Sequence, residues 1–127
     1  MTKVFIIDDD PIHQRIAQIM IGKHKLFDEF DSYIEAEFAL EYLKHNMDNS
    51  SGLPDVILLD LNMPVVDGWD FLEAFAKFQS DLSKQIRVFI VTSSVDEKDR
   101  LRSQTFPFVK GFISKPLSPD IIRSTIA

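Results

Sequence analysis

The stretch that decides the fold is residues 4–11, which read Val4-Phe5-Ile6-Ile7-Asp8-Asp9-Asp10-Pro11. Four consecutive apolar residues, without polar residues between them, are typical of a parallel strand that is covered on both faces. Three aspartates end this run, and the proline that follows suits the first position of a helix. The stretch therefore predicts a strand over residues 3–7 that leads through an acidic turn into a helix.

The same alternation of strand and helix continues along the chain. Three more strands with buried character are predicted at Asp55–Leu59, Arg87–Thr92 and Val109–Ser114, and a weaker edge strand at Phe30–Tyr33. A helix that begins at Pro11 is predicted because Ile12, Ile16, Ile19 and Met20 recur at helical spacing, and further helices are predicted at Ala36–His45, Trp69–Phe78, Asp96–Ser103 and Pro119–Ala127. Five repeats of strand and helix predict an α/β fold with an open parallel sheet.

The length and composition exclude several classes of protein. The chain has 127 residues, which fits a single domain, and 20 acidic against 14 basic residues, a net charge of −6. A net acidic chain argues against nucleic acid as the direct partner, because phosphate binding requires a basic surface. The absence of cysteine excludes thiolate catalysis and disulfides. No apolar run is as long as the apolar segment of a signal peptide or the ~20 residues of a membrane span. We therefore expect a cytoplasmic protein without membrane contact.

The residues at the strand ends are chemically related. In open parallel sheets the functional site lies at the carboxyl ends of the strands. Carboxylates that gather there repel one another unless a cation neutralises them, and Mg²⁺ prefers such oxygen ligands. Lysine and threonine are partners for phosphate, and an aspartate can be the nucleophile in phosphoryl transfer. The strand ends carry Asp8-Asp9-Asp10, Asp60, Thr92-Ser93-Ser94 and Lys115-Pro116.

A simpler interpretation explains each of these residues singly. An aspartate after a strand is often a helix cap, as Asp10 before Pro11 would be. The segment before Gly68 could be a plain turn in which this glycine supplies unusual backbone angles. The simpler interpretation does not explain why acids, a hydroxyl and a lysine occupy the ends of four different strands.

In this arrangement the chain resembles the receiver domain of two-component response regulators. The resemblance covers essentially the whole chain, as one receiver domain over residues 1–127 with no output domain. It implies a doubly wound, flavodoxin-like sheet of five parallel strands in the order 2-1-3-4-5. The matching segments are residues 4–11, 56–64, Asp67-Gly68, Val91-Thr92-Ser93 and residues 112–116.

The resemblance also implies roles for individual residues. Asp60 would accept a phosphoryl group from a histidine kinase or phosphotransfer protein, and would be the only group that the domain phosphorylates and dephosphorylates. Lys115 and Thr92 would bind the phosphoryl group, and Thr92 and the aromatic Phe112 would switch a face that contacts a downstream protein. Mg²⁺ or Mn²⁺ would be held by Asp8, Asp9, Asp60 and the backbone carbonyl of Asn62. Asn62 and Ser94 would tune the dephosphorylation rate.

Some features depart from the family or favour another one. Family members often carry Gly-Ala where this chain has Phe108-Val109, after a segment in which Pro107 should stop the helix. A haloacid-dehalogenase-type phosphatase that uses Asp8 and Asp10 is the alternative, although it leaves Asp60 unexplained. A receiver that binds partners without phosphorylation would lack one of the key residues, and none is missing. The three histidines, including His13, are interpreted as solvated, and the chain as a monomer or weak homodimer.

Overall fold

Five parallel strands form one sheet in the order β2-β1-β3-β4-β5 in the computed structural model, which describes residues 2–61, 63, 66–93 and 96–126. The predicted fold class is therefore confirmed, and the weaker strand β2 is indeed at an edge. The strands are β1 (Lys3–Ile7), β2 (Glu29–Tyr33), β3 (Val56–Asp60), β4 (Arg87–Thr92) and β5 (Val109–Ser114). The helices are α1 (Pro11–His24), α2 (Ala36–His45), α3 (Gly68–Ala76), α4 (Glu97–Ser103) and α5 (Pro119–Ile126), with a 3-10 turn at Gln79–Asp81.

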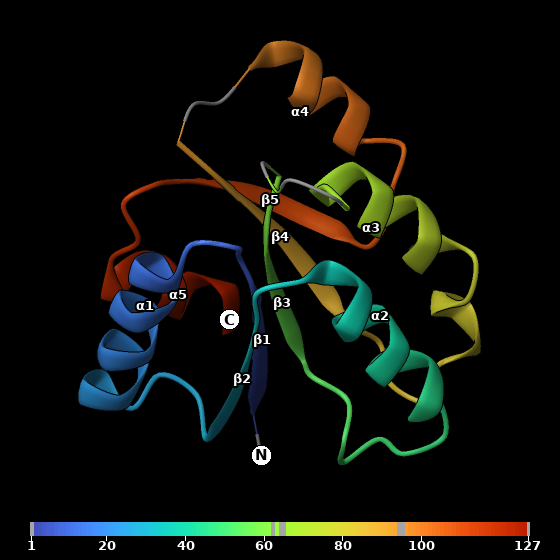
Figure 1. Cartoon of the computed structure of the whole chain (residues 1–127), viewed down its shortest axis with the longest axis horizontal. Coiled ribbons are helices and arrows are strands. Elements are labelled where there is room, and N and C mark those ends of the chain that lie inside the picture. Colours follow the sequence, from blue (N-terminus) through green and yellow to red (C-terminus); the bar gives the residue numbers. More distant parts are fainter. Residues whose placement is uncertain (1, 62, 64–65, 94–95, 127) are drawn as a thin grey trace.

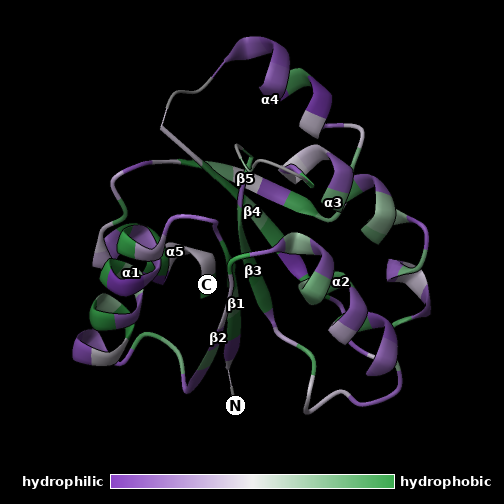
Figure 2. Cartoon of the chain, viewed as in Figure 1, coloured by the Kyte–Doolittle hydropathy of each residue, from purple (hydrophilic) through white to green (hydrophobic). Residues whose placement is uncertain are grey.

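The helices cover both faces of the sheet. In Figure 1, α1 and α5 lie on one side of the strands and α2 and α3 on the other. Alternate residues of β1 follow this division: Phe5 and Ile7 belong to the hydrophobic cluster beneath α2 and α3, and Val4 and Ile6 to the cluster beneath α1 and α5. The central strands are correspondingly apolar in Figure 2, whereas most of α4 is hydrophilic. Burial on both faces explains why the strand sequences are continuously apolar.

The boundaries of the predicted elements shift by one or two residues. The third strand ends at Asp60 instead of Leu59, so the aspartate is the last residue of the strand. The third helix begins one residue before Trp69 and ends at Ala76, and the last helix is described to Ile126, with Ala127 outside the described residues. No described helix is both long and apolar enough to cross a membrane.

The apolar spacing that predicts α1 does not mark the face that packs on the sheet. Ile12, Ile16 and Ile19 are exposed by 69%, 49% and 55%, although apolar residues at this spacing are usually buried. The buried face of α1 consists of Gln14, Ala17 and Ile21. The helix was thus predicted correctly, but a polar side chain occupies its core-facing side and isoleucines face the solvent.

The segment between α4 and β5, where the chain departs from the family pattern, forms an aromatic contact. Phe108 is buried in the cluster beneath α2 and α3, which agrees with simple packing. Phe106 is partly buried and its ring stacks near Trp69 of α3, with ring centroids 6.4 Å apart. The Arg102 guanidinium lies 4.4 Å from the Trp69 ring centroid, at a distance that favours a cation–π interaction. The departure therefore joins the end of α4 to α3.

Tyr33 at the edge strand provides a pH-dependent contribution to stability. Its ring centroid lies 5.1 Å from that of Phe5, and its burial, together with the nearby Asp31, raises the pKa of the phenol to about 12. A raised pKa means that the folded state favours the neutral phenol. The resulting stability is complete below the ordinary pKa of 10.0 and is lost as the pH rises towards 12.

We therefore expect the free energy of unfolding of the wild type to fall more steeply above pH 10 than that of Tyr33→Phe, which cannot ionise. Urea unfolding followed by circular dichroism on both sides of this pH measures the difference. Parallel curves for the two proteins would contradict the assignment to Tyr33.

Candidate functional site

The register of the sheet brings the predicted strand-end residues to one edge. Ile7 pairs with Leu59, so Asp8 and Asp60 follow at neighbouring strand ends. Thr92 at the end of β4 pairs with Ser114 of β5, and the next residue is Lys115. The Lys115 backbone N–H donates a hydrogen bond to the Thr92 carbonyl oxygen at 2.8 Å, which ties the segment after β5 to the end of β4.

Three carboxylates form a cluster with the composition of a cation site. Asp8, Asp9 and Asp60 each offer a carboxylate oxygen, and these oxygens lie within 4.8 Å of one another. Asp8 and Asp60 are almost completely buried, with 6% and 5% exposure. Carboxylate oxygens are the ligands that hard divalent cations prefer, and gathered charges of one sign favour a cation between them. The donor set therefore fits a divalent metal ion; the fourth predicted ligand, Asn62, lies outside the described residues.

Lys115 lies against this cluster. Its Nζ is 3.3 Å from Asp8 Oδ2 and 3.4 Å from Asp60 Oδ2, and its side chain is 16% exposed. Buried carboxylates are costly unless they are paired and hydrogen-bonded, so this ammonium offsets part of their charge. One lysine thus contacts the ends of two neighbouring strands.

Asp10 has a different environment from the clustered aspartates. Its Oδ1 accepts a hydrogen bond from the Ile12 backbone N–H at 2.8 Å, and this bond lowers the pKa of the Asp10 carboxyl. Its own backbone N–H donates to Asp8 Oδ1 at 2.9 Å. Asp10 is therefore the N-cap of α1, as the simpler interpretation expected, and the alternative phosphatase chemistry gains no support from it.

His13 is exposed, as expected of a solvated side chain, and it also borders the site. Its Nδ1 lies 3.1 Å from Lys115 Nζ and 3.4 Å from Asp10 Oδ2. It lines a cavity of about 360 Å³ with Asp9, Asp60, Ser93 and Lys115, among others. The signal that could have placed it there is its position in the first turn of a helix capped by the acidic segment.

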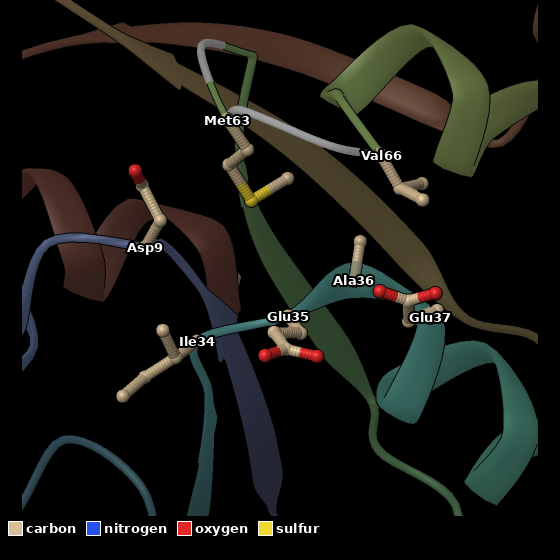
Figure 3. A pocket seen from close by; sticks show the side chains of 7 residues that line it. All are labelled: Asp9, Ile34, Glu35, Ala36, Glu37, Met63 and Val66. Atoms are coloured by element: carbon tan, nitrogen blue, oxygen red, sulfur yellow. The ribbon is translucent and has the colours of Figure 1, made fainter.

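A second cavity, of about 280 Å³, is also lined by Asp9. Figure 3 shows Asp9 near the end of β1, Glu35 and Glu37 at the start of α2, and Met63 and Val66 across from these glutamates. Two further carboxylates, both exposed, therefore share a cavity with Asp9 but are not part of the acidic cluster.

The two predicted switch residues lie at different places. Thr92 is 3% exposed at the end of β4, beside the acidic edge. Phe112 pairs with Ile90 further back along the sheet and is partly buried. It lines a groove between α4 and β5, together with Arg100 and residues 103–104 and 109–111. Ser94, predicted to tune the dephosphorylation rate, lies outside the described residues.

Gly68 packs directly against the backbone next to Asp60. Its N–H donates to the Leu61 carbonyl oxygen at 3.1 Å, and a Cβ built on Gly68 would lie 2.7 Å from Leu61 Cα and 2.8 Å from the Asp60 carbonyl oxygen. None of the chain's glycines has a positive φ. The expectation that Gly68 supplies unusual backbone angles is therefore wrong, and this position requires glycine because α3 approaches the end of β3 closely.

The fold agrees with the comparison to known proteins. The family model of the response regulator receiver domain matches residues 4–127, so the chain belongs to this family of two-component signalling proteins. This result confirms the resemblance stated from the sequence.

Individual relatives share the domain at low identity. The chain is 32% identical over 126 residues to the two-component response regulator ORR1 of Oryza sativa subsp. japonica, and 25% identical over 123 residues to the probable methanogenesis regulatory protein FilR2 of Methanothrix harundinacea. These alignments cover 97% of this chain in each case, but 53% of the rice protein and 77% of the archaeal one. The crystal structure of a two-component response regulator from Cytophaga hutchinsonii has the same fold, with a TM-score of 0.87, 24% identity and coverage of 99% of this chain and 94% of that one.

The close approach at Gly68 yields a prediction about stability. Gly68→Ala should lower the free energy of unfolding by about 1–3 kcal/mol, because a methyl group forced into packed backbone must displace it. The matched control is Gly22→Ala on the exposed side of α1, where no described atom other than the adjacent backbone of the helix and the two neighbouring residues lies within 4 Å of the new Cβ. This variant should stabilise the chain by about 0.5–1 kcal/mol through helix propensity. Urea denaturation of both variants measures the contrast, and equal effects would contradict it.

Proposed function

We propose that this domain is the phosphoacceptor of a two-component phosphorelay and that Asp60 is the residue that is phosphorylated. The observation that carries the proposal is the position of Asp60 between two acids and Lys115 Nζ, which lies 3.4 Å from its carboxylate. A carboxylate can attack phosphorus only if the repulsion between two anions is offset, and the nearby ammonium supports this.

The reaction is a simple transfer. A carboxylate oxygen of Asp60 forms a bond to phosphorus while the bond from phosphorus to the imidazole nitrogen of a donor histidine breaks, and this nitrogen keeps the electron pair. Lys115 and Thr92 are the chain's groups for binding the transferred phosphoryl oxygens, one as a cation and one as a hydrogen-bond donor. Positioning and charge compensation are the main requirements of such a transfer.

We propose Mg²⁺ as the ion for the acidic cluster, with Asp8, Asp9 and Asp60 as its protein carboxylate ligands. When bound, this ion neutralises part of the negative charge on the phosphoryl oxygens. Mn²⁺ has similar ligand preferences and is the substitute we expect.

Phosphorylation would act as a switch because it changes the charge beside Lys115 and Thr92. A phosphorylated carboxyl carries more negative charge and more acceptor oxygens than the free one, so both side chains interact with it more strongly. Such differential contact is what a population shift requires. The partly buried Phe112 and its groove between α4 and β5 form the face through which we propose that a downstream protein senses the change.

The first test is phosphorylation by a small phosphodonor in the presence of Mg²⁺, followed by intact mass spectrometry. The wild type should gain one phosphoryl group and Asp60→Asn none. Asp10→Asn is the control and should gain the group as the wild type does, because asparagine also caps helices well.

The result can also favour the alternative. No adduct on the wild type, or the same adduct on Asp60→Asn, would overturn the assignment. Turnover of a phosphate ester that is lost in Asp8→Asn and retained in Asp60→Asn would instead indicate the phosphatase.

The exposed isoleucines of α1 support a docking surface for the phosphodonor protein. Ile16 lines a cavity of about 300 Å³ together with Asp8, Lys115 and Leu117, so the apolar face of α1 is continuous with the acidic edge. Ile12 and Ile19 extend this face along the helix. Adjacent exposed apolar side chains commonly mark protein contact sites, and a donor histidine must approach Asp60 across this edge. We propose that a histidine kinase or phosphotransfer protein docks here.

Ile16→Asp should therefore slow phosphoryl transfer from a cognate phosphotransfer protein by about tenfold, the equivalent of about 1.4 kcal/mol. Transfer from a small phosphodonor should not change, because that donor needs no docking surface. The control is Leu101→Asp on α4, where the side chain is similarly exposed at 56%. Equal slowing by both substitutions, or slowing with the small donor as well, would contradict the docking proposal.

A further inference from the structure

Gln14 makes polar contacts at the buried side of α1. The residue is 4% exposed, and its Nε2 lies 3.0 Å from each of three backbone carbonyl oxygens, those of Ile6, Asp8 and Tyr33. Three acceptors around one atom identify that atom as the amide nitrogen and not the oxygen. The side chain therefore links α1 to the ends of β1 and β2.

This arrangement is costly for a core position. An amide nitrogen carries two hydrogens, fewer than the three acceptors that surround it. The other end of the amide, Oε1, is buried and has no hydrogen-bond partner among the described residues. An unpaired buried polar atom destabilises a fold, and the neighbouring core-facing residues Ala17 and Ile21 are apolar. Packing alone does not account for a glutamine at this position.

The three carbonyl groups surround the start of the acidic segment. Two of them, those of Ile6 and Asp8, lie on the two sides of Ile7. The third, that of Tyr33, also accepts the Asp8 backbone N–H at 3.0 Å. The Asp8 carbonyl belongs to the peptide group that leads into Asp9, so a hydrogen bond to it restrains the backbone from which both carboxylates project.

We propose that Gln14 is a positioning residue for metal binding, which holds the backbone of Asp8 and Asp9 so that their carboxylates converge with that of Asp60. This inference rests on the proposed function, because it assumes that the acidic cluster binds Mg²⁺. Gln14 itself contacts neither the carboxylate oxygens nor the reacting atoms.

The test compares two glutamines of the same helix. Gln14→Met retains the length of an unbranched side chain but loses all three contacts. Gln18→Met is the matched control, because among the described residues Gln18 Nε2 donates only to Ser32 Oγ, at 2.7 Å. Calorimetric titration of the full chain with Mg²⁺ should show a dissociation constant about tenfold higher for Gln14→Met than for the wild type, as is typical when an outer partner of metal ligands is lost. The control should remain within about twofold of the wild type, a margin well below that effect.

A second variant keeps the test informative if Gln14→Met does not fold. Gln14→Asn retains an amide but is one methylene shorter, so it cannot reach all three carbonyls, and it should weaken Mg²⁺ binding in the same direction. Thermal unfolding by circular dichroism verifies that each protein is folded. The Mg²⁺-induced rise in the midpoint should be smaller for the Gln14 variants, since stabilisation by a ligand depends on its dissociation constant.

The possible outcomes separate the two proposals. Wild-type affinity in a folded Gln14 variant, or equal weakening in Gln18→Met, would overturn the role of Gln14 and leave the phosphoacceptor proposal intact. A wild-type chain that binds no Mg²⁺ would overturn the proposed metal site and this inference together.

Discussion

The pairing of Lys115 with Asp8 and Asp60 is the interaction on which the arrangement of this edge of the sheet depends. Both acids are nearly inaccessible to water, at the ends of the apolar strands β1 and β3. Buried charges persist only when they are compensated, and removal of one partner leaves an expensive unpaired charge. Lys115 follows β5, with β4 between it and β3, so a single ammonium reaches across the sheet to two strand ends. The clustering of Asp8 and Asp60 and the placement of β5 at the edge of the sheet therefore stabilise each other.

The same pairing gives the proposed switch its physical basis. The ammonium of Lys115 donates to two carboxylates, and it also lies 3.1 Å from His13 Nδ1. A phosphoryl group on Asp60 would compete for these donors with a larger negative charge, so the contacts of Lys115 would change. Because the Lys115 backbone is hydrogen-bonded to Thr92, a change at the lysine is mechanically linked to the end of β4. The groove at Phe112 lies along β5, the strand next to β4.

The sequence predicts the parts of the site that follow from topology and misses the parts that follow from packing. Asp8, Asp60 and Lys115 could be placed together because the carboxyl ends of parallel strands meet at one edge. The buried face of α1 could not be predicted in this way, because the apolar pattern indicates the isoleucines. Gln14 is buried instead, and its amide contacts backbone carbonyl groups of β1 and β2. The need for glycine at residue 68 likewise arises from the close approach of α3 to the end of β3. This tertiary contact cannot be predicted from the residues of the turn alone.

The site residues are spread over nearly the whole chain, and Asp8 and Lys115 are 107 positions apart. Contacts of such long sequence separation form slowly, because a long loop must close before they are made. During synthesis on the ribosome, the acidic segment emerges first and the lysine almost last, so the charge-compensated edge is assembled only when translation of the domain is nearly complete. A nascent or truncated chain that lacks β5 retains the carboxylates without their cation. If Asp60 is the phosphoacceptor, as we propose, the ammonium that offsets its charge is supplied only after the last strand of the sheet has been made.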